Sequence, residues 1–111
     1  MTNSNRKGKR GELELAKWLS ERGHTARRGQ QYRGGGDSPD VVCDSLPLHF
    51  EVKRTERLRL HEAVEQAIAD AAEGQTPVVA YRASRRPWLA ILKLDDLLTL
   101  IRGNEHEPRN P

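Results

Sequence analysis

Cysteine is nearly absent from this sequence, which has Cys43 and no second thiol among its 111 residues. A disulfide needs two thiols, and no other cysteine or histidine stands beside Cys43 to build a zinc site. We therefore expect neither a disulfide nor zinc. Since Cys43 lies in an apolar stretch, it is predicted to pack in the core of a protein from a reducing compartment.

Long apolar runs are absent as well. No stretch approaches the length of a membrane span, and the polar residues 1–5 lack the apolar segment of a signal peptide. A soluble, intracellular protein with no membrane partner is expected. A chain of 111 residues has room for one core, so we predict one domain over residues 1–103, with a basic N-terminal arm, and a disordered tail over residues 104–111.

Acidic residues are scarce in the first third of the chain. Residues 1–36 carry nine Lys or Arg against three Glu, a net charge of +6, whereas residues 37–111 carry ten against thirteen Asp or Glu, a net charge of −3. Clustered positive charge suits a polyanion such as nucleic acid. The alternative is a basic surface that only maintains solubility.

Residues 38–42 and 48–53 predict two strands of a hairpin, joined by the turn-forming residues 44–47. Side chains alternate between the two faces of a strand, so residues 48–53 divide into a charged face and an apolar face. The charged face carries His49, Glu51 and Lys53, and the apolar face carries Leu48, Phe50 and Val52.

Asp40 and Glu51 would be carboxylates on neighbouring strands, and such a pair can hold a hard divalent cation. Lys53, two residues further on, could orient a water molecule or steady a phosphate. The alternative is an ordinary hairpin whose outer face carries a solvated Glu51–Lys53 pair.

A helix is predicted from Lys9 to Glu21, ended by Gly23. At about 100° per residue, Glu12 shares the apolar stripe of Leu15, Ala16 and Leu19, while Glu14, Lys17 and Glu21 project from the opposite face. A buried carboxylate is costly unless it is paired or bound to a cation, so Glu12 is a candidate site residue. The alternative is a partly buried glutamate that the helix dipole favours near an N-terminus.

The remaining elements predict an α/β fold. They are a strand at 24–28, a glycine-rich loop at 29–38, a helix at 60–73 ended by Gly74, strands at 77–82 and 88–93, and a short helix at 96–101 ended by Gly103. A helical crossover joins the third and fourth strands, which predicts a single domain with a central mixed five-stranded sheet flanked by helices. The apolar run at 88–93 predicts a central strand or one covered on both sides. His61 and Gln66 lie off the apolar stripe of the second helix and are expected at the surface.

Several of these motifs occur together, and in this order, in one known family. Lys7-Gly8, Glu12-x-Glu14-Leu15, Gly23, Arg28, Pro39-Asp40 and Glu51-Val52-Lys53 resemble the archaeal-type Holliday junction resolvases of the PD-(D/E)xK nuclease superfamily. The resemblance covers the first half of the chain, and beyond Lys53 it depends on the order of elements alone. Leu13 stands where some members have Arg, and the loop with Gly34-Gly35-Gly36 is longer than in several relatives.

The resemblance implies a restriction-endonuclease-like core and a catalytic set of Glu12, Asp40, Glu51 and Lys53. Its metal ligands would be Asp40, Glu51, the Val52 carbonyl and Glu12, with Mg²⁺ as the cofactor and Mn²⁺ able to replace it. The residues expected to bind DNA are Arg6, Lys7, Lys9, Arg10, Arg28 and Arg33, of which Arg28 comes from the resemblance.

The implied activity is a DNA endonuclease of recombination and repair that makes paired, symmetric nicks in four-way junctions. It would act in the cytoplasm of a prokaryote or of a phage-infected host cell. Two alternatives are another structure-selective or nicking endonuclease of the same fold, and a DNA-binding module that does not cut.

A junction is close to two-fold symmetric, and one site cuts one strand, so we expect a homodimer. The candidate dimer surfaces are the alanine-rich stripe from Ala63 to Ala71 and the apolar residues Leu89 and Ile91. Both could equally be ordinary core.

Overall fold

The computed structural model of the chain describes residues 2–29 and 40–105, and the side chains of residues 8–29 and 40–103. Its elements are α1 (Thr2–Ser20), β1 (Ala26–Arg28), β2 (Val41–Cys43), β3 (Leu48–Arg54), α2 (Leu60–Asp70), β4 (Thr76–Arg82), β5 (Leu89–Ile91) and α3 (Leu94–Glu105). The predicted order of helix, three strands, helix, two strands and helix is confirmed. No helix in the described ranges is long and apolar enough to span a membrane.

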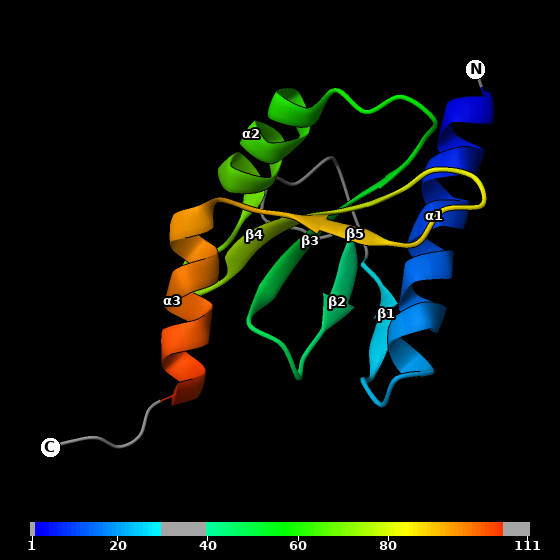
Figure 1. The fold of residues 1–111 in the computed structure, drawn as a ribbon. Helices are drawn as coiled ribbons and strands as arrows, with labels where there is room; N and C mark the ends of the chain where they lie inside the picture. The colour runs from blue at the N-terminus through cyan, green and yellow to red at the C-terminus, as the bar shows by residue number, and fades with distance from the viewer. Residues whose placement is uncertain (1, 30–39, 106–111) are drawn as a thin grey trace, which may run out of the picture.

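The five strands form one sheet in the order β1-β2-β3-β4-β5 (Figure 1). β3 and β4 are parallel, and the other neighbours are antiparallel. Parallel neighbours need a crossover connection, and α2 provides it between β3 and β4. The predicted α/β fold, a single domain with a mixed five-stranded sheet and flanking helices, is confirmed, and it is consistent with a restriction-endonuclease-like core.

Each face of the sheet is covered by one helix, because adjacent residues of β4 enter different cores. On the α1 side the buried residues are Leu15, Ala16, Leu19, Val41, Cys43, Phe50, Val78 and Ala80. On the α2 side they are Ala63, Ala67 and Val79. Cys43 is buried, as predicted.

The alternation predicted for β3 is confirmed. Phe50 and Val52 belong to the α1-side core, whereas Glu51 is in register with Val79, which belongs to the α2-side core. The charged face of β3 is therefore the face that α2 covers.

Several element boundaries differ from the prediction. α1 begins at Thr2, so the expected basic arm is part of a helical backbone, since a single glycine at position 8 costs only about 1 kcal/mol in a helix. β1 begins two residues later than expected, and β2 covers Val41–Cys43, which leaves Asp40 just before the strand. The loop predicted over 29–38 lies almost entirely in residues 30–39, outside the described residues.

The two later helices also end elsewhere than their glycines predicted. α2 ends at Asp70 because Ala71 is already extended, and Gly74, with φ +89°, occupies the turn beyond it. α3 starts earlier than expected and continues through Gly103 to Glu105, because one glycine weakens an exposed helix without ending it.

Residues 88–93 were predicted to form a central strand or one covered on both sides, and the central alternative is wrong. Among the described strands, β5 pairs with β4 alone and forms an edge of the sheet, with Leu89 51% exposed. The continuous apolar pattern has another cause. Trp88 and Leu92 pack against the α1-side core, whereas Ile91 packs against the α2-side core, so the segment contributes to both faces.

Candidate active site

Asp40 is held by the backbone on both sides of it. Its amide donates to the Phe50 carbonyl at 2.9 Å, and the Gly29 amide donates to its carbonyl at 2.9 Å. Its side-chain Oδ2 accepts a hydrogen bond of 2.8 Å from the amide of Val52. The Asp40 carboxylate is thus held against β3 at Val52, the residue between Glu51 and Lys53.

Glu51 and Lys53 lie together on the α2 side of β3. Glu51 is 5% exposed. The Lys53 Nζ is 3.8 Å from Glu51 Oε2, and the lysine side chain is 34% exposed. A buried carboxylate with a cation at its outer edge is not the solvated surface pair of the alternative interpretation.

Glu12 comes to this region from α1. Its Oε1 accepts a 2.6 Å hydrogen bond from Arg28 Nε, and its side chain is 13% exposed. The close approach of α1 depends on Gly11, because a Cβ there would lie 2.7 Å from the Cβ of Arg54. Glu12 is inward-facing, as predicted, and its partner is the arginine that the resemblance placed near the site.

The carboxylates of Glu12, Asp40 and Glu51 are close enough to affect one another's charge. Burial raises the pKa of Glu51 to about 7, and the charge of Asp40 adds to this rise while Lys53 opposes it. Burial also raises the pKa of Glu12, the hydrogen bond from Arg28 opposes that rise, and Asp40 again adds to it. Negative charge is therefore crowded around Asp40, and a bound cation would relieve the repulsion.

The donor chemistry fits a hard divalent cation with few protein ligands. In the described part of the chain, no three Asp, Glu, His or Cys side chains converge as ligands of one ion. Mg²⁺, however, commonly binds through one or two carboxylates together with waters and substrate phosphates. Asp40 and Glu51 would form such a pair, and their role as ligands, like that of Glu12 and the Val52 carbonyl, stays a prediction.

His49 lies two residues before Glu51 on the same strand face. It is 1% exposed, and its Nε2 has no hydrogen-bond partner among the described residues. Burial lowers the pKa of His49, and the charges of Asp40 and Asp70 oppose this. A neutral imidazole with an unsatisfied nitrogen is costly, and sequence alternation had placed His49 on this face without indicating its burial.

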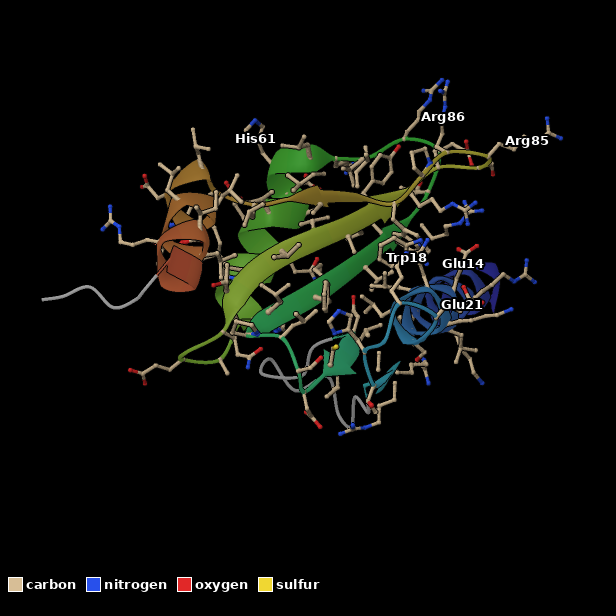
Figure 2. The ribbon with its side chains drawn as sticks, turned by 60° about the horizontal axis from the view of Figure 1, so that its bottom comes forward. Glu14, Trp18, Glu21, His61, Arg85 and Arg86 are labelled. Carbon is tan, nitrogen blue, oxygen red and sulfur yellow. The ribbon has the colours of Figure 1, made fainter. Side chains whose placement is uncertain are left out.

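A pocket of about 300 Å³ adjoins Lys53, and two of the residues that line it are Arg57 and Arg59. Neither arginine was predicted as a site residue. Arg57 and Arg59 lie in the connection between β3 and α2, which was expected to be only a polar link. Gln66 lines the same pocket and is exposed, and His61 is also exposed, as predicted (Figure 2). The two arginines following soon after Glu51-Val52-Lys53 were the available sequence signal.

Glu14 was predicted to project from the helix face opposite the apolar stripe, but it contacts the sheet instead. It accepts a hydrogen bond of 2.9 Å from Arg54 on β3 and pairs with Arg82 on β4. Figure 2 shows Glu14 on α1 on the side near the β4–β5 loop that carries Arg85 and Arg86. These pairs hold α1 against the sheet, which keeps Glu12 at the site.

Three of the six residues expected to bind DNA have side chains that the structure describes. Lys9 and Arg10 are exposed on α1, and Arg28 is committed to Glu12. Arg33 and the side chains of Arg6 and Lys7 lie outside the described residues.

Comparison with known proteins identifies the family. No curated protein and no solved structure matches this chain. A scan of protein-family models matches residues 3–109 to the family described as "Phage putative PDDEXK endonuclease". That match spans nearly the whole chain and includes Asp40, Glu51 and Lys53. The match supports membership of the PD-(D/E)xK superfamily and a nuclease activity. It does not support the archaeal-type Holliday junction resolvase subfamily that the sequence resembled. The chain therefore belongs to the family of phage putative PDDEXK endonucleases.

Proposed function

We propose that this protein is a metal-dependent DNA endonuclease that nicks branched DNA, with the four-way junction as its preferred substrate. The observation that supports it most is the Asp40 carboxylate, anchored to the Val52 amide beside the buried Glu51 and its Lys53 partner. The family match supports a nuclease. The basic first third of the chain supports a nucleic-acid substrate.

The chain's own residues would divide the chemistry. Asp40 and Glu51 would hold Mg²⁺, or Mn²⁺ in its place, with Glu12 and the Val52 carbonyl as further ligands. Bound there, the cation would supply positive charge against the scissile phosphate and lower the pKa of water. Lys53 would orient the attacking water and stabilise negative charge on the phosphate oxygens in the transition state.

The hydrolysis itself is a simple exchange of bonds. The water oxygen joins phosphorus, the bond from phosphorus to the 3′-oxygen breaks, and a proton reaches that oxygen. The products are a 5′-phosphate and a 3′-hydroxyl. Arg57 and Arg59, which line the pocket beside Lys53, would contact the flanking phosphates of the same strand.

A junction needs two opposed nicks, so we propose that the protein acts as a homodimer with one site in each copy. Paired nicks placed symmetrically about the crossover would follow from that symmetry. The setting proposed is DNA recombination or repair in the cytoplasm of a phage-infected or other prokaryotic cell.

The test of the active site is a cleavage assay with Mg²⁺. Asp40→Asn and Lys53→Ala should each lower the cleavage rate at least roughly 100-fold, since the first removes a ligand charge for the cation and the second removes the cation that acts on the reacting phosphate. DNA affinity measured in Ca²⁺ and far-UV circular dichroism should change little. Asp44→Asn and Lys93→Ala are matched controls, because both residues are exposed and lie outside the site. Near wild-type cleavage by either site variant would remove the assignment.

The test of the substrate uses labelled four-way junction, flap, duplex and single strand under the same conditions. The junction should be cut fastest, with paired nicks on opposed strands. Equal cleavage of plain duplex would exclude junction selectivity and favour a nicking endonuclease. Binding without cutting in either Mg²⁺ or Mn²⁺ would favour a non-cleaving DNA-binding module.

A further inference from the structure

α3 turns its apolar stripe toward solvent. Leu94, Leu97, Leu98 and Ile101 are 68%, 38%, 53% and 46% exposed. Their spacing of three, four and seven residues places them on one side of the helix. Asp96 and Leu100, on the other side, are only half exposed. The main apolar stripe of α3 therefore faces away from the body of the protein.

Nothing in the described part of the chain covers this stripe. α3 makes no extensive contact with another helix or strand there, and Figures 1 and 2 both place it at the end of the sheet opposite α1. A helix of 12 residues is only marginally stable in water without packing. A contiguous exposed apolar stripe of this kind is typical of an interface with another molecule, and is unusual on a surface that faces only water.

The remaining residues of this sequence have few apolar side chains. Residues 1, 30–39 and 106–111 lie outside the described ranges, and they include Met1 and Tyr32 but no Leu, Ile, Val, Phe or Trp. Burying four large aliphatic side chains requires apolar partners. A second copy of the chain, which carries the same four aliphatic residues, would supply such partners.

The charges beside the stripe fit a second α3 in antiparallel orientation. Asp95 and Arg102 are seven residues apart, so they lie on the same flank of the helix, and both are exposed. When a two-fold axis relates two antiparallel helices that pack face to face, the same flank of each helix lies on the same side of the interface. Asp95 of one copy then lies beside Arg102 of the other, twice, while Leu98 lies near the axis.

We propose that the apolar stripe of α3 binds the same stripe of a second copy, antiparallel and around a two-fold axis. The value of this dimer for paired nicking rests on the function proposed above, whereas the surface itself is inferred from α3. Of the two candidate surfaces named from the sequence, the alanine stripe is unsuitable because Ala63 and Ala67 are buried against the sheet. In the other candidate, Leu89 is 51% exposed but Ile91 packs against the α2-side core.

The first test measures the mass of the full chain without DNA by analytical ultracentrifugation between about 1 and 100 μM. The wild type should be a dimer, and Leu98→Glu should be a monomer, because two buried carboxylates would face each other at the axis. Leu13→Glu is the matched control, since Leu13 is 50% exposed on α1. It should remain a dimer.

The second test distinguishes a second copy from a different partner and does not depend on the apolar variant. Asp95→Arg or Arg102→Asp alone should raise the dimer Kd about fivefold, because each removes two surface ion pairs. The double variant should restore wild-type affinity within about twofold, because the reversed charges again meet across the axis.

Three results would overturn the proposal: a wild-type monomer across the range, a dimer that survives Leu98→Glu, or a double reversal that fails to restore affinity. Circular dichroism of each variant identifies loss of folding. A wild-type dimer that cuts no junction would overturn the proposed activity and leave the α3 interface standing. A monomer that cuts would overturn the α3 interface and the homodimer, and leave the proposed endonuclease activity standing.

Discussion

Among the described residues, Glu51 has the largest pKa shift, and it belongs to the candidate site. Its pKa of about 7 lies well above the ordinary value of 4.5, chiefly because the carboxyl is buried and secondly because Asp40 is near. The folded protein therefore keeps a proton on Glu51 that the unfolded chain releases between pH 4.5 and about 7. This stabilisation is complete below pH 4.5 and is lost as the pH rises through 7.

Glu51→Gln should consequently stabilise the metal-free protein at high pH. We expect equal stability at pH 4 and a gain in unfolding free energy of at most about 3 kcal/mol at pH 8, measured by urea denaturation in EDTA. Added Mg²⁺ should raise the melting temperature of the wild type at pH 8 and leave that of the variant unchanged. If the difference in unfolding free energy between the variant and the wild type were the same at pH 8 and pH 4, the raised pKa of Glu51 would be contradicted.

His49 shifts stability in the opposite direction. Its pKa is lowered by burial, so the unfolded chain takes up a proton first as the pH falls below about 6.5, and stability declines there. His49→Leu should remove this decline and the unsatisfied Nε2, with a gain of about 1 kcal/mol at pH 7. Urea denaturation at pH 5 and pH 7 measures both effects as differences from the wild type. A loss above about 2 kcal/mol would indicate that Nε2 has a partner in solution.

At the scale of elements, the contact of α1 with β3 determines whether Glu12 reaches the site. Gly11 permits this contact because its missing Cβ would meet the Cβ of Arg54 at 2.7 Å. Glu14 adds ion pairs to Arg54 and Arg82, so two strands hold the same helix. A helix that shifted outward would carry Glu12 away from Asp40.

Gly11→Ala and Gly8→Ala form a matched pair that separates packing from helix propensity. Both replace a glycine of α1, but a Cβ at position 8 meets nothing within 4 Å. Gly8→Ala should stabilise the protein by up to about 1 kcal/mol. Gly11→Ala should destabilise it by roughly 1–2 kcal/mol through overpacking against β3, and should slow cleavage. Equal stabilisation by both substitutions in thermal denaturation would show that α1 does not need this close approach.

At the scale of the whole molecule, positive charge is concentrated in the N-terminal third. Lys9 and Arg10 lie exposed on α1, the helix that also supplies Glu12 to the site. Arg57 and Arg59 lie beside Lys53 on the α2 side. DNA that reaches the site would therefore meet cations from two separate segments.

Replacing Arg6, Lys7, Lys9 and Arg10 with Gln should weaken DNA binding and flatten its salt dependence. The slope of log K against log salt should fall by roughly one unit for each phosphate that the variant no longer neutralises. The twofold variant of Lys9→Gln with Arg10→Gln has a matched control in Arg85→Gln with Arg86→Gln. Both variants replace two adjacent, exposed basic residues. Arg85 and Arg86 lie in the β4–β5 loop (Figure 2). An unchanged slope in the fourfold variant, measured by fluorescence anisotropy, would mean that the start of α1 does not touch DNA.

Much of the fold and the centre of the site could be predicted from the sequence, because both depend on short-range periodicity. Alternation over residues 48–53 placed Glu51 and Lys53 on the face opposite Phe50 and Val52. Phe50 and Val52 do belong to the α1-side core, and Glu51 is in register with Val79 of the α2-side core. The helical period predicted that Glu12 faces inward, and its side chain is 13% exposed. The crossover between the third and fourth strands required α2 to join parallel neighbours.

The tertiary structure decided what depends on distant partners. Arg54 and Arg82 lie 40 and 68 residues beyond Glu14, so no local pattern could show that Glu14 binds the sheet. The apolar run around β5 indicated burial, but its residues enter different cores and leave the strand at an edge. For α3, periodicity shows that a helix has an apolar side, but only the packed molecule shows that this side is left uncovered.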